Sequence, residues 1–153
     1  MRRETSHMRY ASMATAMGII IFDLVTKSYW FARASMWTTL TPLLQTVHHR
    51  NYGLLFNLPA PPWFTVSVSM IVLLVAFYVL RARFGEARIA IGFGMIAGGA
   101  FGNVYDRLTL HFVRDWILVA ERSAFNVADV AVIIGLLLIL FSVEKTDTLP
   151  VGS

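Results

Sequence analysis

The sequence predicts an all-α membrane protein with four transmembrane helices, and with a small extended element and loops on one outer face. Two observations carry this prediction. Hydrophobic residues make up 57% of the 153 residues and charged residues only 14%, against about 25% charged residues in soluble domains. The apolar residues also gather in four long runs, and a spanning helix needs about 20 mainly apolar residues. The length fits one integral membrane domain over residues 1–153.

The first run covers about residues 11–30 and follows several arginines. A basic start before an apolar run is also the pattern of a secretory signal peptide. No small-x-small cleavage site follows this run; Asp23, Lys27 and the aromatic residues 29–31 come instead. Because aromatic residues of this kind gather at membrane interfaces, we expect a retained first span.

The other runs cover about residues 63–80, 89–105 and 126–143. A short basic turn over residues 81–88 fits two antiparallel spans, and the polar tail 144–153 is expected to be flexible. Four spans place both termini and this turn on one side, which carries seven Lys and Arg residues against five or six on the other. The positive-inside rule therefore predicts cytoplasmic termini.

The two segments on the opposite side, residues 31–62 and 106–125, are expected to differ in structure. The first contains the segment 47–56, in which Asn51 to Gly53 favour a turn. We expect a short strand or hairpin there, lying on the outer surface. The second is expected to be a loop.

The few polar residues of the spans gather at one membrane face, whichever way the chain is oriented. Ionisable residues within a span cost about 2.5–3.5 kcal/mol each, so they indicate function by default. Asn126 and Asp129 are three residues apart and can project into one cavity from the first helical turn, where the helix dipole favours an acid. Purely structural alternatives also exist: Asp23 and Lys27 can form an ion pair, and Asn126 can cap a helix. The cluster comprises Asp23, Lys27, Asn51, Asn103, Asp106, Arg107, Asp115, Asn126 and Asp129.

A stripe of small residues, Gly94, Gly98 and Gly102, runs along the third predicted span. Small residues at this spacing let another helix approach closely. Gly99 adjoins the stripe, and either serves the same packing or makes room for a substrate.

Among the residue types that can catalyse a reaction, only carboxylates remain as candidates in this sequence. The chain has no cysteine, which excludes a disulfide scaffold, a thiolate zinc site and a cysteine nucleophile. It has no His-Glu-x-x-His and no Gly-x-Ser-x-Gly sequence, and the adjacent His48 and His49 are poorly spaced as metal ligands. We expect neither a metal nor a cofactor.

Two aspartates held close together cannot both ionise comfortably, so one keeps its proton while the other activates a water. Asp115 and Asp129 flank the same short segment, which must fold back before the fourth span begins. A facing pair is therefore plausible. Asp106 is a competing candidate, but it directly precedes Arg107 and is more readily a salt-bridge partner.

Five motifs follow one another at the outer ends of the spans and in the outer loops. They are Asp23-x-x-Thr26-Lys27, Asn51-x-Gly53-x-x-Phe56, Gly98-Gly99-Ala100-x-Gly102-Asn103-x-x-Asp106-Arg107, Val113-x-Asp115-Trp116 and Phe125-Asn126-x-Ala128-Asp129. In this order, and over nearly the whole chain, they resemble the motifs of the lipoprotein signal peptidase (signal peptidase II) family.

The resemblance implies a membrane aspartic endopeptidase of the bacterial inner membrane. Such an enzyme removes the signal peptide of a prolipoprotein just before a cysteine that carries diacylglycerol. By match, Asp115 and Asp129 are the catalytic pair, and Asp23, Lys27 and Asp106 belong to structural parts of the motifs. Positions that line or support the site are Asn51, Gly53, Gly99, Asn103, Arg107, Asn126 and Ala128.

The sequence departs from the family pattern at two places. Leu55 stands where the second motif usually has Ala, which can narrow a pocket beside the substrate. The segment between the two aspartates is shorter than in many relatives. It carries Glu121 and Arg122 where an aromatic, proline-bearing stretch is common, which affects how a lid over the site closes.

The expected partners are lipid-modified prolipoproteins and membrane lipids, with the active site near the outer leaflet, and the chain is expected to be a monomer. Nucleic acid is not expected, because the net charge of +4 is spread over several short stretches and not concentrated on one face.

Two alternatives come from other functional classes. A carrier or channel subunit with a proton or ion relay would place polar residues along the depth of the bundle, yet the inner halves of the spans are nearly free of them. A membrane accessory or binding protein would carry acids only at the interface. Loss of cleavage on substitution of Asp115 or Asp129 by Asn discriminates the protease from both.

Overall fold

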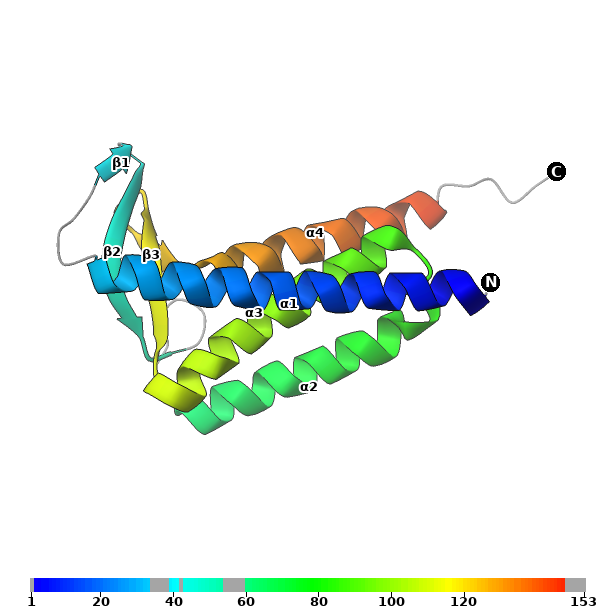
Figure 1. The fold of residues 1–153 in the computed structure, drawn as a ribbon, viewed down its shortest axis with the longest axis horizontal. Helices are drawn as coiled ribbons and strands as arrows, with labels where there is room; N and C mark the ends of the chain where they lie inside the picture. The colour runs from blue at the N-terminus through cyan, green and yellow to red at the C-terminus, as the bar shows by residue number, and fades with distance from the viewer. Residues whose placement is uncertain (1, 34–38, 42, 54–59, 148–153) are drawn as a thin grey trace.

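A computed structural model of the chain describes residues 2–33, 39–41, 43–53 and 60–147. Within these residues, helices run lengthwise beside one another and a small sheet lies across one end of them (Figure 1). The N-terminal end of the first helix and the C-terminal end of the last lie at the other end. The helices are α1 (Arg2–Arg33), α2 (Pro62–Leu80), α3 (Ala87–Leu110) and α4 (Val127–Asp147).

Among the described residues, three helical segments have the length and composition of membrane spans, Ser6–Arg33, Pro62–Arg83 and Ala87–Leu110. The apolar part of α4, Val127–Ser142, is shorter. All four predicted apolar runs are helical, so the sequence located the helices correctly. Helix α4 continues to Asp147, into the first residues of the tail 144–153 that was expected to be flexible. No Gly or Pro interrupts the chain there; the rest of the tail lies outside the described residues.

Helix α3 is the central element, because it packs against α1 on one side and against α4 on the other. The predicted glycine stripe faces α1. A Cβ atom on Gly98 would lie 2.7 Å from the carbonyl oxygen of Ala16, and one on Gly94 would meet the carbonyl of Ser12. On the opposite face of α3, a Cβ atom on Gly92 would lie 2.7 Å from the carbonyl oxygen of Gly135 in α4. The prediction of close helix packing is confirmed.

The turn between α2 and α3 is tied to the end of α4. Arg83 donates to both carboxylate oxygens of Glu86, at 2.7 and 3.1 Å. The hydroxyl of Ser142 donates to Glu86 Oε2 at 2.9 Å. These bonds hold the basic turn against α4 at the end away from the sheet.

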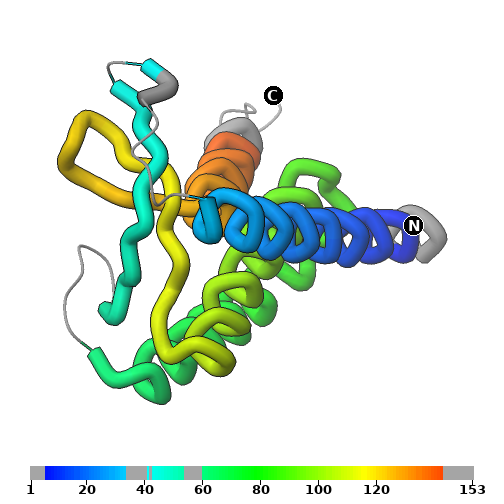
Figure 2. Tube along the Cα trace, turned by 60° about the vertical axis from the view of Figure 1, so that its left-hand side comes forward, coloured from blue at the N-terminus to red at the C-terminus, as the bar shows by residue number. Residues whose placement is uncertain are grey.

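The described strands form an antiparallel sheet in the order β1-β2-β3-β4. Figure 2 shows β2 and β3 side by side beyond the ends of the helices. In this pair Asn51 lies opposite Val113 and Leu44 opposite Val119, with an irregularity between Thr46 and His49. The strands are β1 (Thr39–Thr41), β2 (Leu44–Asn51), β3 (Val113–Val119) and β4 (Ser123–Phe125).

The sheet is larger than the sequence predicted. A strand was expected in segment 47–56, and β2 covers its first part; residues 54–59, which include Leu55, lie outside the described residues. The strands β3 and β4 lie where a loop was predicted, so that expectation was wrong. The hairpin between them turns through Ala120 and Glu121, whose φ angles are 50° and 57°. Positive φ at both central residues is the geometry of the tight turns that suit hairpins.

Candidate active site

Asn126 brings the two aspartates of the predicted pair together. Its side-chain amide donates to Asp115 Oδ1 at 2.6 Å. Its backbone N–H donates to Asp129 Oδ2 at 3.3 Å. Asp115 lies on β3 and is 1% exposed, whereas Asp129 lies in the first turn of α4. One residue therefore contacts both carboxylates, one from the sheet and one from the helix.

The same residue begins α4. Asn126 Oδ1 accepts a hydrogen bond from the backbone N–H of Asp129 at 3.0 Å, while Asp129 Oδ2 accepts from the backbone N–H of Asn126. This reciprocal pair has the form of a capping box, which satisfies two otherwise unpaired N–H groups of a helix start. The cap and the contact with Asp115 thus use different atoms of Asn126, so the predicted structural and site roles coexist.

Each carboxylate also receives a second amide. Asn51 Nδ2 donates to Asp115 Oδ2 at 3.1 Å, and Asn103 Nδ2 donates to Asp129 Oδ1 at 2.9 Å. Asn126 Nδ2 further donates to Asn103 Oδ1 at 3.2 Å. The asparagines of three predicted motifs therefore surround the pair with donors.

The proton affinity of Asp115 suits acid–base chemistry near neutral pH. Burial raises the pKa of this carboxyl to about 7, and the neighbouring charge of Asp129 also raises it. The amide donors from Asn51 and Asn126 act in the opposite direction, since they favour the charged carboxylate. Burial prevails because transfer of a carboxylate out of water is costly.

A buried charge cluster is connected to the pair through Asn103. Lys27 Nζ lies 2.7 Å from Asp23 Oδ2 and 3.4 Å from Asp106 Oδ2, and all three side chains are fully buried. Lys27 also donates to Asn103 Oδ1 at 2.8 Å. The predicted ion pair between Asp23 and Lys27 is present, and it is connected to the aspartate pair through Asn103.

The remaining partners of this cluster tie α1, α3, α4 and β3 together. Asp23 Oδ1 accepts from the backbone N–H of Ala128 at 2.9 Å. Asp106 pairs with Arg114 of β3, at 2.7 Å between Oδ1 and the guanidinium. It also accepts from the backbone N–H of Arg114 at 3.0 Å. Asp106 is therefore a salt-bridge partner, as predicted, but its partners are Arg114 and Lys27.

Arg107 reaches from α3 to the loop after β2. Its guanidinium donates to the carbonyl oxygen of Gly53 at 2.9 Å. The backbone N–H of Gly53 donates to Asn51 Oδ1 at 2.9 Å, which aims the amide nitrogen of Asn51 at Asp115. Arg107 thus holds the loop whose asparagine contacts the pair.

Helices α3 and α4 pack closely against each other at Gly99 and Ala128. A Cβ atom on Gly99 would meet the carbonyl of Ala128 and lie 2.9 Å from Val132 Cγ2. Ala128 is fully buried. Of its two predicted roles, Gly99 therefore has the packing role here.

The sequence motifs that meet at this site belong to a known family. The model of the signal peptidase (SPase) II family matches residues 15–144 of the chain. The chain belongs to the signal peptidase II family. The expected resemblance is thereby confirmed, and the matched range contains every predicted site residue.

Individual signal peptidase II relatives and solved structures agree. A lipoprotein signal peptidase of Aquifex aeolicus (strain VF5) is 30% identical over 139 residues, covering 84% of this chain and 82% of that protein. One of Ectopseudomonas mendocina (strain ymp) is 31% identical over 143 residues, covering 84% and 85%. A bacterial membrane enzyme solved at 2.3 Å by the in meso method has a TM-score of 0.79 and 26% identity, over 90% of this chain and 89% of that chain.

Two features of this signal peptidase II chain were missed from the sequence. The sequence does not single out Arg114, yet it pairs with Asp106 and closes the cluster around it. The run 113–119, rich in β-branched and aromatic residues, is the signal that could have indicated β3.

Within the described residues, no group of three or more His, Asp or Glu side chains could hold a metal ion.

Proposed function

We propose that this signal peptidase II is a membrane-embedded aspartic endopeptidase that cleaves the signal peptide of a diacylglyceryl-modified prolipoprotein just before the lipidated cysteine. The observation that best supports this proposal is that Asn126 contacts both Asp115 and Asp129. A protein of this family with a buried Asp115 and a partly buried Asp129, both hydrogen-bonded by amides and both in contact with one residue, has what water activation requires.

The proposed chemistry needs one proton on the pair. The charged carboxylate takes a proton from a water, whose oxygen attacks the carbonyl carbon of the scissile peptide. The protonated carboxyl gives its proton to the carbonyl oxygen. Collapse of the resulting diol passes a proton to the amide nitrogen and breaks the C–N bond. The products are the carboxyl end of the signal peptide and the free amino group of the lipidated cysteine.

The surrounding residues orient the two carboxylates and do not themselves transfer protons. The amides of Asn51, Asn103 and Asn126 orient the two carboxylates. Arg107 and Gly53 hold the loop that carries Asn51. Asp23, Lys27 and Asp106 keep the structural role predicted for them, since they join the elements beneath the pair.

The membrane placement follows from the same proposal. Residues 1–153 form one integral membrane domain, and α4 is the fourth span. The apolar part of α4, Val127–Ser142, is shorter than the roughly 20 residues of an ordinary span, and a short span is accommodated by local thinning of the bilayer. The termini are cytoplasmic in a bacterial inner membrane, and the sheet end lies at the outer leaflet, where a diacylglyceryl group would be held. The enzyme acts as a monomer.

Cleavage of a diacylglyceryl-modified prolipoprotein in lipid tests the proposal. Asp115→Asn and Asp129→Asn should each abolish cleavage while the protein stays folded and inserted. Glu121→Gln is the matched control, because it makes the same carboxyl-to-amide change in the exposed β3–β4 turn. Undiminished cleavage by either aspartate variant would remove that residue from the mechanism. Equal loss in the control would show a general effect of charge.

A further inference from the structure

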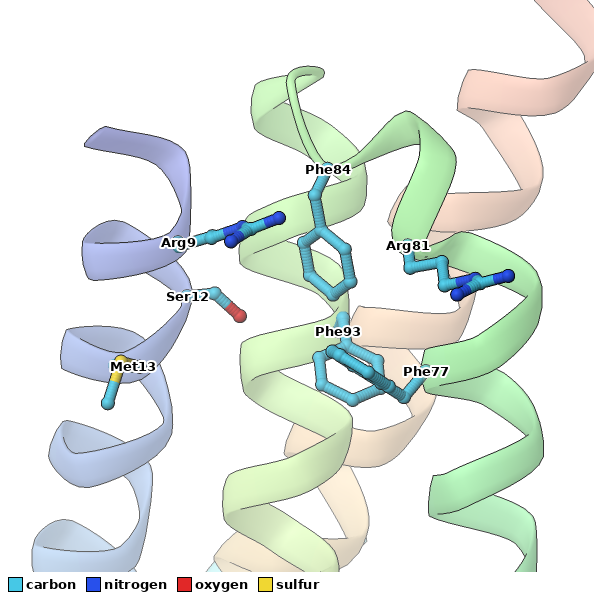
Figure 3. Close-up of a pocket in the computed structure, with 7 residues that line it drawn as sticks. All are labelled: Arg9, Ser12, Met13, Phe77, Arg81, Phe84 and Phe93. Atoms are coloured by element: carbon cyan, nitrogen blue, oxygen red, sulfur yellow. The ribbon is translucent and has the colours of Figure 1, made fainter. Parts of the chain in front are cut away.

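A cavity lies at the end of the helices opposite the sheet. It has a volume of about 280 Å³ and lies between α1 and α2, against α3 (Figure 3). This is slightly below the roughly 300–1,000 Å³ of small-molecule pockets, which suits one flexible chain better than a bulky ring system. None of the residues described at the aspartate pair contributes to it.

The wall of this cavity is an aromatic cluster from three different elements. Phe84, from the turn before α3, lies 5.2 Å from Phe93 of α3 and 5.7 Å from Phe77 of α2, measured between ring centroids. Phe84 is only 5% exposed, whereas Phe77 is 50% exposed. The buried ring therefore supports the others, and Phe77 leaves apolar surface available.

The cavity is open sideways between two helices. Both α1 and α2 pack against α3, but they make few contacts with each other. Met13 of α1 lines the cavity and is 66% exposed. Because this part of the chain is expected within the bilayer, an opening between helices faces acyl chains and not water.

Two arginines stand at the rim. Arg9 of α1 and Arg81 at the end of α2 both line the cavity and are exposed (Figure 3). Neither has a carboxylate partner among the residues that the structure describes; Arg81 lies 4.3 Å from the ring centroid of Tyr78. The nearby carboxylate of Glu86 is already bound by Arg83. The rim is therefore positive above an apolar wall.

We propose that this cavity binds one anionic glycerophospholipid. Its acyl chain lies against Phe77 and Phe93. Its phosphate contacts Arg9 at the rim, and also Arg81 once the exposed guanidinium of Arg81 turns away from the Tyr78 ring (Figure 3). Guanidinium groups match phosphate geometry with paired donors. Basic pockets between helices on the cytoplasmic side of a membrane attract anionic headgroups. The bound chain fills the gap between α1 and α2, so it joins two helices that otherwise meet chiefly through α3.

The test compares retention of dioleoyl phosphatidylglycerol and dioleoyl phosphatidylcholine by the purified protein, measured by native mass spectrometry. The wild type should retain one phosphatidylglycerol in preference to phosphatidylcholine. Arg9→Gln with Arg81→Gln should reduce that preference about twenty-fivefold, at about fivefold for each arginine. Arg88→Gln with Arg122→Gln removes the same charge outside the cavity and should change little.

A second pair of variants tests the apolar part. Met13→Trp should fill the cavity and prevent retention of the lipid, whereas Met17→Trp, one turn along α1 and outside the lining, should not. Thermal melting and prolipoprotein cleavage in detergent verify that each variant is folded. Equal retention of the two lipids by the wild type would overturn the proposal. So would equal losses in both arginine pairs, or unchanged binding in Met13→Trp.

Discussion

Lys27 donates a hydrogen bond to the side-chain oxygen of Asn103 at 2.8 Å, and this bond connects the buried charge cluster to the aspartate pair. With its oxygen held by Lys27, the amide of Asn103 must turn its nitrogen toward Asp129, to which it donates at 2.9 Å. The ion pair in α1 therefore sets the orientation of a group that the proposed chemistry uses. We expect its contribution to activity to pass through Asn103.

The first prediction concerns Lys27 itself. Lys27→Met leaves Asp23 buried beside no cation, and loss of one partner of a buried ion pair costs about 3–5 kcal/mol. We expect a large fall in melting temperature, with activity lost together with the fold. Asp23→Asn in the same chain should restore part of the stability, because it removes the uncompensated charge. Arg33→Met, a surface change at the end of α1, is the control.

The outcome that contradicts this structural role is specific. If Lys27→Met melted like the wild type but had no activity, Lys27 would act by orienting Asn103 and not by stabilising the fold. Melting in detergent and cleavage of the prolipoprotein, measured on the same samples, separate the two possibilities.

The second prediction separates the two functions of Asn126. Asn126→Ser keeps a good helix cap but lacks the amide that donates to Asp115. Hydrogen bonds to charged groups contribute about 1.5–3 kcal/mol, so cleavage should fall roughly 10–100-fold with little change in melting temperature. Asn126→Ala should lose the cap as well, at a further cost of about 1 kcal/mol in stability. Equal activity of Asn126→Ser and the wild type would mean that the amide does not support the pair.

The third prediction is a bell-shaped dependence of kcat/KM on pH. The pKa of Asp115 is raised to about 7 by burial and by Asp129, so above this pH the pair loses its shared proton and activity falls. At low pH a second proton binds and no carboxylate is left to activate water. The two apparent values belong to the pair and not to either residue.

Asn51 provides the control for that profile. Its amide stabilises the charged form of Asp115, so Asn51→Ala should move the alkaline limb to higher pH. Glu121→Gln should leave both limbs where they are. Activity that keeps rising above pH 9, in protein shown to stay folded, would count against a shared proton.

The fourth prediction concerns the contact of α3 with α4. A side chain at Gly99 would press on the carbonyl of Ala128, next to Asp129. Overpacking of this kind costs about 1–3 kcal/mol, so Gly99→Ala should lower both melting temperature and cleavage. Gly18→Ala is the matched control, because nothing lies within 4 Å of its Cβ position. Similar effects of the two substitutions would show that the contact is not specific.

The sequence predicted well wherever neighbours along the chain decide the structure. The apolar runs located the helices, the spacing of Asp23 and Lys27 predicted their pairing, and the stripe through Gly98 predicted close packing. Each of these depends on helical periodicity, which is local. The motif order then predicted the family, although the contacts of its residues could not be derived from order.

The failures occur where distant segments meet. The strand β3 was taken for a loop because it is stabilised by pairing with β2, more than sixty residues earlier in the chain. Arg114 was not recognised as a partner of Asp106 because the chain must leave α3 and enter the sheet before the two meet. The amide network of Asn51, Asn103 and Asn126 has the same origin, since its members come from three separate elements.

By itself the sequence determined that polar residues gather at one end of apolar helices, because lipid tolerates them nowhere else without partners. It also determined that carboxylates are the reactive groups available there. Only the tertiary structure decided that Asn126 contacts both Asp115 and Asp129 while capping α4. It also decided that Lys27 contacts Asn103, which in turn contacts Asp129. Hydrogen bonds depend on distance and direction at the scale of a few tenths of an ångström, and the packing of α3 against α1 and α4 sets those distances.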